Sequence, residues 1–431
     1  MAQAMDIDDV YLAGIMEVLP DAVVQYMLSS IRNARDVAIC ACVCQRWREA
    51  MVHVRSLYFP RTVCDEKINQ SDAVVNRMVL STSSLEELIV YCPFSGKSLL
   101  AWLSHTSKTL KHLELRMDNL GEKNPGPNCP STLDYIASSP HLESLKLWGV
   151  SLKQLPAWNP FIKLHTLEVV GVRAQDTALY NMLLACPMLK NLALLGCDGA
   201  KVVDIELKHL EQCRLDFYGI GDCFLNITAP KLQVFEIQGA AWIRLRGDHS
   251  LRQLSIANNA GKVSKVECGR LSDLESLSMR GVQWSWDAID TVLQSATEVK
   301  NLVMKIEFSG DTDRLLPFPE INLVDFFTSH PRLTNFEVHG AMFAALSQKN
   351  SLLRLDDSFS MPCLEEISIT VRSPLNADQK MTTLESLVKH GRQLRRLTVR
   401  VSQMKNCQET ADKFFEKVLR FKQRSHIVII E

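Results

Sequence analysis

The stretch PHLESLKLWGV (residues 140–150) decides the fold, because its apolar residues follow a pattern that recurs along the chain. An apolar residue is followed by two polar ones, a second apolar residue, one variable residue and a third apolar residue. The pattern occurs thirteen times in 431 residues, at steps of mostly 19 to 25 residues that lengthen to 30 or more in four places. The first apolar residues of the copies are Leu85, Leu110, Leu142, Leu164, Leu189, Leu210, Leu232, Leu251, Leu274, Val299, Leu333, Leu364 and Leu394.

This register and period predict leucine-rich repeats. The last two apolar residues of each copy are two apart, so they point to one face of a short strand. Apolar residues at helical spacing lie between the strands, in residues 177–187, 287–297, 323–331 and 382–391. We therefore expect an α/β solenoid of about 13 repeats, with a parallel concave sheet and outer helices. Residues 411–431 predict a helix and a strand that cap its C-terminal end, and residues 118–131 predict an irregular loop.

The first sixty residues lack the repeat and predict helices, broken at residues 32–35, with Asp36 as the N-cap of the last one. On one continuous helix Cys40, Val43, Cys44 and Trp47 form an apolar stripe, while Cys42 lies about 200° from Cys40. Three sulfurs so placed cannot meet one zinc ion, and the chain has no Cys-x-x-Cys motif. We expect buried thiols here and no metal site.

This helical segment is too small to bury its apolar side chains internally. A partner protein is therefore expected to cover part of its surface. The apolar residues concerned are Leu19, Val23, Val24, Met27, Leu28, Ile31, Val37, Ile39, Val43 and Trp47.

Four short motifs in this segment carry a resemblance to a known family. Leu19-Pro20-Asp21, the segment Leu28 to Ile31, Asp36-Val37 and the segment Val43 to Arg48 resemble the successive motifs of an F-box. With leucine-rich repeats behind it, the chain resembles a plant-type F-box/LRR-repeat protein. The division that this resemblance implies is a flexible N-terminus (1–14), an F-box (15–58) and a leucine-rich-repeat domain with its C-terminal cap (59–431).

Proteins of this family are substrate receptors of Skp–cullin–F-box ubiquitin ligases. The resemblance implies that the F-box binds a Skp-type adaptor, and through it a cullin and a RING protein. It also implies that the chain itself has no catalytic residues and acts by bringing a substrate close to a ubiquitin-charged enzyme. The residues implied to face the adaptor are Leu19, Pro20, Ile31, Val37, Val43, Cys44 and Trp47.

A protein substrate is expected on the concave face, whose residues alternate with the buried ones on each strand. Trp148 is the candidate anchor, because an aromatic side chain among charges is typical of binding hot spots. The later half of this face is basic, which favours an acidic or phosphorylated peptide, with scattered surface charge as the alternative. The candidate substrate-binding residues are Arg116, Lys146, Trp148, Arg214, Arg280, Lys305, His339 and Arg400.

Composition excludes several other classes. The formal net charge of −1 gives no global attraction to nucleic acid, and no apolar run is long enough to span a membrane. Catalytic and phosphate-binding motifs are missing, and we expect no cofactor. Thirteen scattered cysteines and an acidic start without a signal peptide indicate an intracellular protein of the cytoplasm or nucleus.

One alternative function stays open at this point. A leucine-rich-repeat scaffold could bind protein or nucleic acid without delivering ubiquitin. Its support is the stretch 392–424, which has ten Lys or Arg residues against three Asp or Glu.

Overall fold

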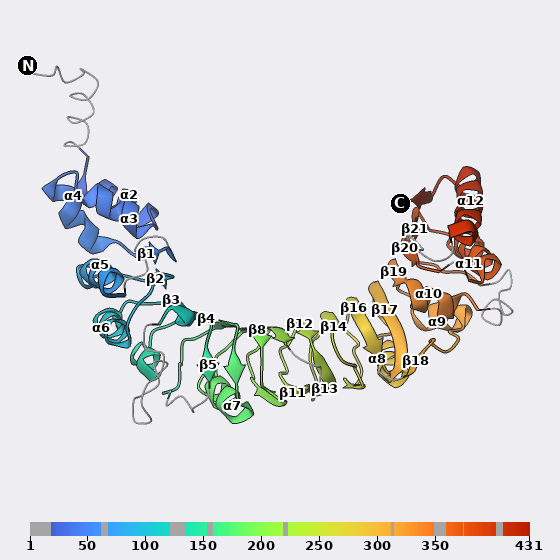
Figure 1. The fold of residues 1–431 in the computed structure, drawn as a ribbon, viewed down its shortest axis with the longest axis horizontal. Coiled ribbons are helices and arrows are strands. Elements are labelled where there is room, and N and C mark those ends of the chain that lie inside the picture. The colour runs from blue at the N-terminus through green and yellow to red at the C-terminus, as the bar shows by residue number, and fades with distance from the viewer. Residues whose placement is uncertain are drawn as a thin grey trace, which may run out of the picture. The chain divides into compact units, whose positions relative to one another are not determined.

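A computed structural model describes residues 19–61, 68–120, 134–152, 158–218, 223–311, 314–348, 359–373, 375–401 and 408–431 (Figure 1). The chain divides into two compact units. Unit 1 is Met1–Val172 with Leu184–Leu189, and unit 2 is Arg173–Leu183 with Lys190–Glu431. The segment 1–14 lies outside the described residues, and the boundary at residue 58 stays a prediction.

Unit 1 begins with helices and continues as a parallel sheet in the order β1-β2-β3-β4-β6. In Figure 1 helices α5 and α6 lie on one side of its first strands. Its elements are α2 (Asp21–Ser30), α3 (Ala34–Ala41), α4 (Gln45–Ala50), η1 (Met51–His53), β1 (Ser56–Phe59), α5 (Ile68–Leu80), β2 (Glu87–Val90), α6 (Gly96–Thr106), β3 (His112–Arg116), η3 (Met117–Asn119), η4 (Asp134–Ser138), β4 (Ser144–Trp148), β5 (Ser151–Leu152) and β6 (Thr166–Val170).

Unit 2 contains a parallel sheet in the order β8-β10-β12-β14-β16-β17-β19-β20-β21-β22, with β18 antiparallel to β17. Its helices after β16 lie on one side of this sheet (Figure 1). The elements of its first part are β7 (Arg173–Ala174), α7 (Asp176–Leu184), β8 (Asn191–Cys197), β9 (Val202–Glu206), β10 (Gln212–Phe217), β11 (Cys223–Thr228), β12 (Val234–Gln238), β13 (Ala240–Arg246), β14 (Gln253–Asn258) and β15 (Lys265–Glu267). Those of the second part are β16 (Ser276–Trp284), α8 (Trp286–Ser295), β17 (Asn301–Asp311), β18 (Arg314–Leu316), α9 (Leu323–Ser329), β19 (Asn335–His339), α10 (Gly340–Leu346), β20 (Glu366–Val371), α11 (Ala377–His390), β21 (Arg396–Val401), α12 (Gln408–Arg424) and β22 (Val428–Ile430).

Every copy of the repeat pattern forms a parallel strand in the strand order of its unit, as predicted. The first apolar residue of each copy is buried just before the strand, from Leu85 to Leu394. The two apolar residues within the strand are also buried, as Leu145 and Leu147 are in β4. The residues between them, such as Lys146, lie on the opposite face of the sheet. We call this face, on which none of the helices described between the strands lies, the open face of each unit.

The outer layer of unit 2 differs in part from the prediction. The sequence predicted helices on the outer side of the sheet, but β9, β11, β13 and β15 form a second parallel sheet in this unit. The apolar residues of these segments occur at every second position, as Leu225 and Ile227 do. A strand places such residues on one buried face, whereas a helix would spread them around its circumference. The solenoid therefore has an outer layer of both helices and strands.

The expected helices and the C-terminal cap are present. Helices α7, α8, α9 and α11 coincide with the four predicted segments, and α8 is capped by Ser285, whose hydroxyl accepts from the Ala288 N–H. At the C-terminal end α12 buries Phe414, Val418 and Phe421, and β22 extends the sheet beside β21. Most of the predicted loop 118–131 lies outside the described residues.

Candidate functional site

The α-helices described before β1, which are α2, α3 and α4, form a small module held together by capping and by one arginine. The Asn33 side chain caps α3 by accepting from the Arg35 N–H at 3.0 Å. Arg46 on α4 donates to the Asp21 carboxylate at 2.6 Å and to the Leu19 carbonyl, so it ties α4 to the start of α2. The Tyr58 N–H of β1 donates to the Arg32 carbonyl at 2.7 Å, which attaches the module to the sheet.

The predicted continuous helix through the cysteines is wrong. Helix α3 ends at Ala41, Cys44 is extended with φ −158° and ψ 171°, and α4 begins at Gln45. Cysteine and β-branched valine are weak helix formers, and three of them together favour a break over one long helix. The apolar stripe through Cys40, Val43, Cys44 and Trp47 therefore does not form.

The prediction of buried thiols also fails for two of the three cysteines. Cys42 and Cys44 are exposed, and Cys40 is half-buried. Outside this segment the thiols of Cys186, Cys197 and Cys213 are buried, and burial raises the pKa of Cys186 and of Cys197 to about 12. Over the described part of the chain, no group of three His, Cys, Asp or Glu side chains is placed to hold a metal ion.

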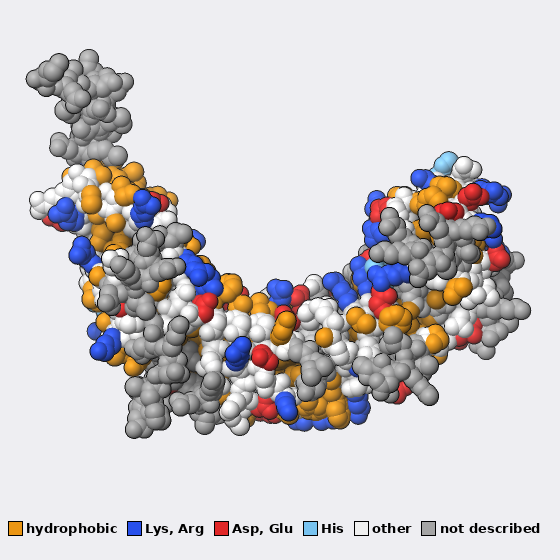
Figure 2. All heavy atoms as spheres, in the orientation of Figure 1, with side chains coloured by type: hydrophobic (Ala, Val, Ile, Leu, Met, Phe, Trp, Pro, Cys, Tyr) orange, Lys and Arg blue, Asp and Glu red, His pale blue; other side chains and the backbone are white. Residues whose placement is uncertain are grey.

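A band of apolar side chains lies on the surface of this module, where Figure 2 shows hydrophobic atoms gathered. Tyr26 is 73% exposed, Ile39 58% and Val43 66%, and Val23 and Met27 are exposed on the same helix as Tyr26. Helix α2 buries Val24 and Leu28 and leaves Val23, Tyr26 and Met27 exposed. Within the described residues, the chain therefore covers only part of the apolar surface of this helix.

The open face of unit 1 is neutralised by its own charges. The Glu114 carboxylate accepts from the Trp148 indole at 2.9 Å and from the Tyr91 hydroxyl, while the Lys146 ammonium lies 3.8 Å from it. Lys146 also pairs with Glu168 at 3.2 Å, and its nitrogen is 4.9 Å from the centre of the Trp148 ring. Burial, followed by the Glu114 carboxylate, raises the pKa of Tyr91. Trp148 is thus held in place rather than free on the surface.

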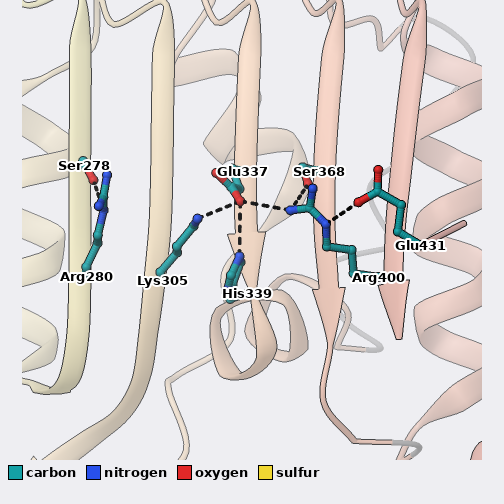
Figure 3. A network of polar contacts seen from close by, with 8 residues as sticks. All are labelled: Ser278, Arg280, Lys305, Glu337, His339, Ser368, Arg400 and Glu431. Carbon is teal, nitrogen blue, oxygen red and sulfur yellow. Dashed lines mark hydrogen bonds and ion pairs between the residues drawn. The ribbon is translucent and has the colours of Figure 1, made fainter. Parts of the chain in front are cut away.

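The open face of unit 2 carries a larger polar network, drawn in Figure 3. The Glu337 carboxylate lies 2.8 Å from Lys305, 3.3 Å from His339 and 3.6 Å from Arg400. Arg400 also pairs with Glu431 at 2.7 Å. One carboxylate therefore serves three basic side chains from three strands.

The protonation states in this network follow from burial and charge. Burial opposes ionisation of Glu337, but the hydrogen bonds and charges of Lys305 and His339 outweigh it and lower the pKa of the carboxyl. Burial also lowers the pKa of His339, helped by Lys305 and Arg372 and opposed by Glu337. His339 is therefore neutral at pH 7, and the network is a carboxylate among cations.

Comparison with known proteins identifies the family. The model of the leucine-rich-repeat domain of At1g61320/AtMIF1 matches residues 79–413. The F-box protein At1g10780 of Arabidopsis thaliana is 48% identical over 419 residues, covering 96% of this chain and 100% of that protein. The chain belongs to the F-box/LRR-repeat family. The F-box/LRR-repeat protein At1g67190 of the same plant is 29% identical over 326 residues, covering 71% of this chain and 74% of its own.

The family membership confirms the resemblance read from the sequence. The assignment of the F-box to the helical module before β1 stays a prediction, and we use the name F-box for this module. The structure divides the seven residues expected to face the adaptor. Val37 and Trp47 are buried and pack inside the F-box, and Leu19 and Ile31 are half-buried. The exposed ones are Pro20, Val43 and Cys44. Tyr26, the most exposed apolar side chain of the F-box, was not predicted, although its place beside Val23 and Met27 on α2 was the signal for it.

The eight residues expected to bind substrate fall into separate groups on the LRR strands. Lys305, His339 and Arg400 meet at Glu337, and Arg280 lies on the strand next to Lys305. Arg214 pairs apart from them with Glu236 at 3.4 Å. In unit 1, Arg116 pairs with Asp118 and Lys146 with Glu168, and Trp148 donates to Glu114. No described helix of the chain is long and apolar enough to cross a membrane.

Proposed function

We propose that this F-box/LRR protein is the substrate-recognition subunit of a Skp–cullin–F-box ubiquitin ligase. Its F-box docks a Skp-type adaptor, which connects it to a cullin and a RING protein, and its LRR open face holds the protein to be ubiquitinated. The chain supplies no catalytic group and accelerates transfer by proximity. Its cysteine usage fits the reducing cytoplasm or nucleus, where such a ligase would act.

The observation that carries the proposal is the exposed apolar band on the F-box. Tyr26, Ile39 and Val43 lie on a module whose core is already filled by Val24, Leu28 and Trp47. Apolar side chains gathered on a small module mark a protein interface. The exposed band is the part of the F-box that an adaptor would cover.

The test is co-expression with a Skp-type adaptor, followed by gel filtration. The native chain should co-elute with the adaptor. Val43→Asp and Ile39→Asp each place a charge in the apolar band, and each should weaken the complex at least tenfold, because burying an unpaired charge costs about 2 kcal/mol or more.

Ile162→Asp is the matched control, because Ile162 is 65% exposed in the same unit but lies outside the F-box. This variant should bind the adaptor like the native chain. A native chain that stays monomeric beside the adaptor would reject the ligase role. The alternative function, a scaffold whose repeats bind partners without delivering ubiquitin, would then be the better-supported hypothesis.

A further inference from the structure

We propose that the open face of unit 2, from β16 to β21, docks an extended acidic segment of a partner protein with carboxylates at alternate positions. The inference rests on the proposed function in one respect, because it takes that partner to be the ubiquitination substrate. The inference specifies the chemical class of the bound segment, which the family membership does not give.

The first observation is a row of side chains at one register position across five neighbouring strands. Arg280 of β16 pairs in register with Lys305 of β17. Met304 of β17 pairs with Val338 of β19. The next residues of these parallel strands, Lys305 and His339, therefore occupy the same register position. The row continues through Thr370 of β20 to Arg400 of β21. We call these five residues the basic row: Arg280, Lys305, His339, Thr370 and Arg400.

The second observation is an imbalance of charge along this row. Its three permanent cations have Glu337 and Glu431 as their described carboxylate partners. Arg280 donates to the Ser278 hydroxyl at 2.8 Å, and within the described ranges no carboxylate lies within ion-pair distance of it (Figure 3). An incoming carboxylate finds charged donors here that the chain itself has not fully paired.

The third observation is the hydroxyl of Thr370. Thr370 is 7% exposed, and its Oγ1 has no hydrogen-bond partner among the described residues. A buried hydroxyl without a partner is costly, so such groups are rare and call for an explanation. Thr370 lies in the row between His339 and Arg400, where a bound carboxylate would accept its hydrogen bond.

The surface is also hollowed at this end of the sheet. A hollow of about 470 Å³ is lined by two arginines and three carboxylates, together with uncharged residues. The charged residues are Arg396, Arg400, Glu337, Glu366 and Glu431, so the hollow suits the uncharged side chains of the segment better than its carboxylates. Side chains of an extended segment that crosses the strands can enter it, with Arg400 at its wall. The hollow thus adjoins the end of the basic row.

The spacing of the row decides between kinds of acidic ligand. Five strands about 4.8 Å apart span about 19 Å, and side chains on one face of an extended peptide repeat every ~6.8 Å. The row therefore matches about three carboxylates at alternate positions. Lys305, His339 and Arg400 converge on the Glu337 carboxylate, so a single phosphate would have to displace Glu337, whereas carboxylates spread along the row can also pair with Arg280.

The experiment measures fluorescence anisotropy of a labelled peptide of alternating Glu and Ser residues against the purified full chain. The peptide is about eight residues long, slightly more than the row requires. The matched peptide replaces each Glu by Gln. We expect saturable binding of the Glu peptide, binding at least tenfold weaker for the Gln peptide, and weakening of the Glu complex as salt is raised.

Variants connect the binding to the row. Lys305→Gln and Arg400→Gln should each weaken binding about fivefold to tenfold, since each removes a charge-assisted hydrogen bond. Arg214→Gln is the control, because Arg214 is an exposed arginine of the same sheet outside the row, and it should change nothing. Thr370→Val should weaken binding severalfold without lowering the melting temperature, because in the free chain it removes an unsatisfied hydroxyl.

Other results overturn the inference. Equal binding of the Glu and Gln peptides, no binding, or loss of binding in Arg214→Gln would each reject it. Tighter binding of a singly phosphorylated peptide or of single-stranded RNA through the same row would replace the acidic segment by that ligand. Adaptor binding is measured by gel filtration on the same preparation, which separates the two proposals. A chain that binds the adaptor but not the peptide rejects this inference alone. A chain that binds the peptide but not the adaptor rejects the ligase role alone.

Discussion

Lys380 places an ammonium group in the interior of unit 2. It is 3% exposed, and its nitrogen donates to the carbonyls of Ser373 and Leu375 at 2.7 Å each. Burial lowers its pKa to about 8, against about 10.5 in the unfolded chain. Between these two values the unfolded chain binds more protons than the folded one. Folding stability should therefore rise as the pH increases through this window and fall as the pH returns to 8.

The expected change is on the order of 2 kcal/mol between pH 8 and pH 10.5. It should be measured by urea unfolding, as the difference in unfolding free energy between the native chain and Lys380→Met. Taking this difference cancels the titration of other lysines, tyrosines and thiols. A difference that stays constant across the window would show that the pKa of Lys380 is not lowered in the folded chain.

His339 gives the basic row a dependence on pH. Its pKa lies below the usual 6.5, because of burial and the charges of Lys305 and Arg372, with Glu337 acting in the opposite direction. Lowering the pH from 7 to 5.5 protonates it in part and adds a positive charge, while the Glu residues of the test peptide stay ionised. The Glu peptide should bind about twofold to fivefold more tightly at pH 5.5, and His339→Gln should remove this gain. If the native chain and His339→Gln showed the same pH dependence of peptide binding, a group other than His339 would be its cause.

At the scale of the element, a glycine fixes how closely two repeats stack. Gly281 in β16 has φ +131°, and a Cβ added there would overlap the Asn258 carbonyl oxygen of β14. Gly281→Ala must therefore shift backbone against backbone, and it should destabilise unit 2 by about 2–4 kcal/mol. Thermal unfolding followed by circular dichroism measures the loss.

Gly269→Ala is the control for backbone conformation alone. Gly269 has φ +58° and no atom within 4 Å of an added Cβ. Its substitution should cost only about 1 kcal/mol, the ordinary penalty for a side chain in the left-handed region. If the two variants lost the same stability, close packing at Gly281 would not be the reason.

The strands could be predicted from sequence because each one repeats a single physical constraint. In all thirteen copies one apolar residue is buried before the strand and two more are buried within it, at positions i and i+2. This burial allows only one choice of inward face and one pairing register for each strand. The outer strands were missed because segments such as residues 223–228 lie outside this pattern.

The site was less predictable than the strands. The break at Cys42 to Cys44 was missed because the same residues also fit a helical stripe, and periodicity alone cannot choose between the two. Basic residues on the open face were found by alternation. Their partners were not, because the contacts of Glu337 with Lys305 and Arg400 join residues 32 and 63 positions apart in sequence.

At the scale of the whole molecule, the described cysteines fall into a reactive group and a protected group. Cys42 and Cys44 of the F-box are exposed, whereas Cys186, Cys197 and Cys213 are buried, and burial raises the pKa of each. A thiol reacts as its thiolate, and burial both restricts access to Cys186, Cys197 and Cys213 and raises the pKa of each. Iodoacetamide at pH 8, followed by peptide mass spectrometry, should modify these two at least tenfold faster than the buried three.

The same measurement tests the adaptor surface without any substitution. Cys44 adjoins Val43 in the exposed apolar band, so a docked adaptor should slow its alkylation, while half-buried Cys363 of unit 2 should react as before. Slowing that is confined to the F-box thiols means that the adaptor covers this surface. An unchanged rate at both Cys42 and Cys44 in a stable complex would mean that the adaptor binds another face, and the exposed band would then need a different partner.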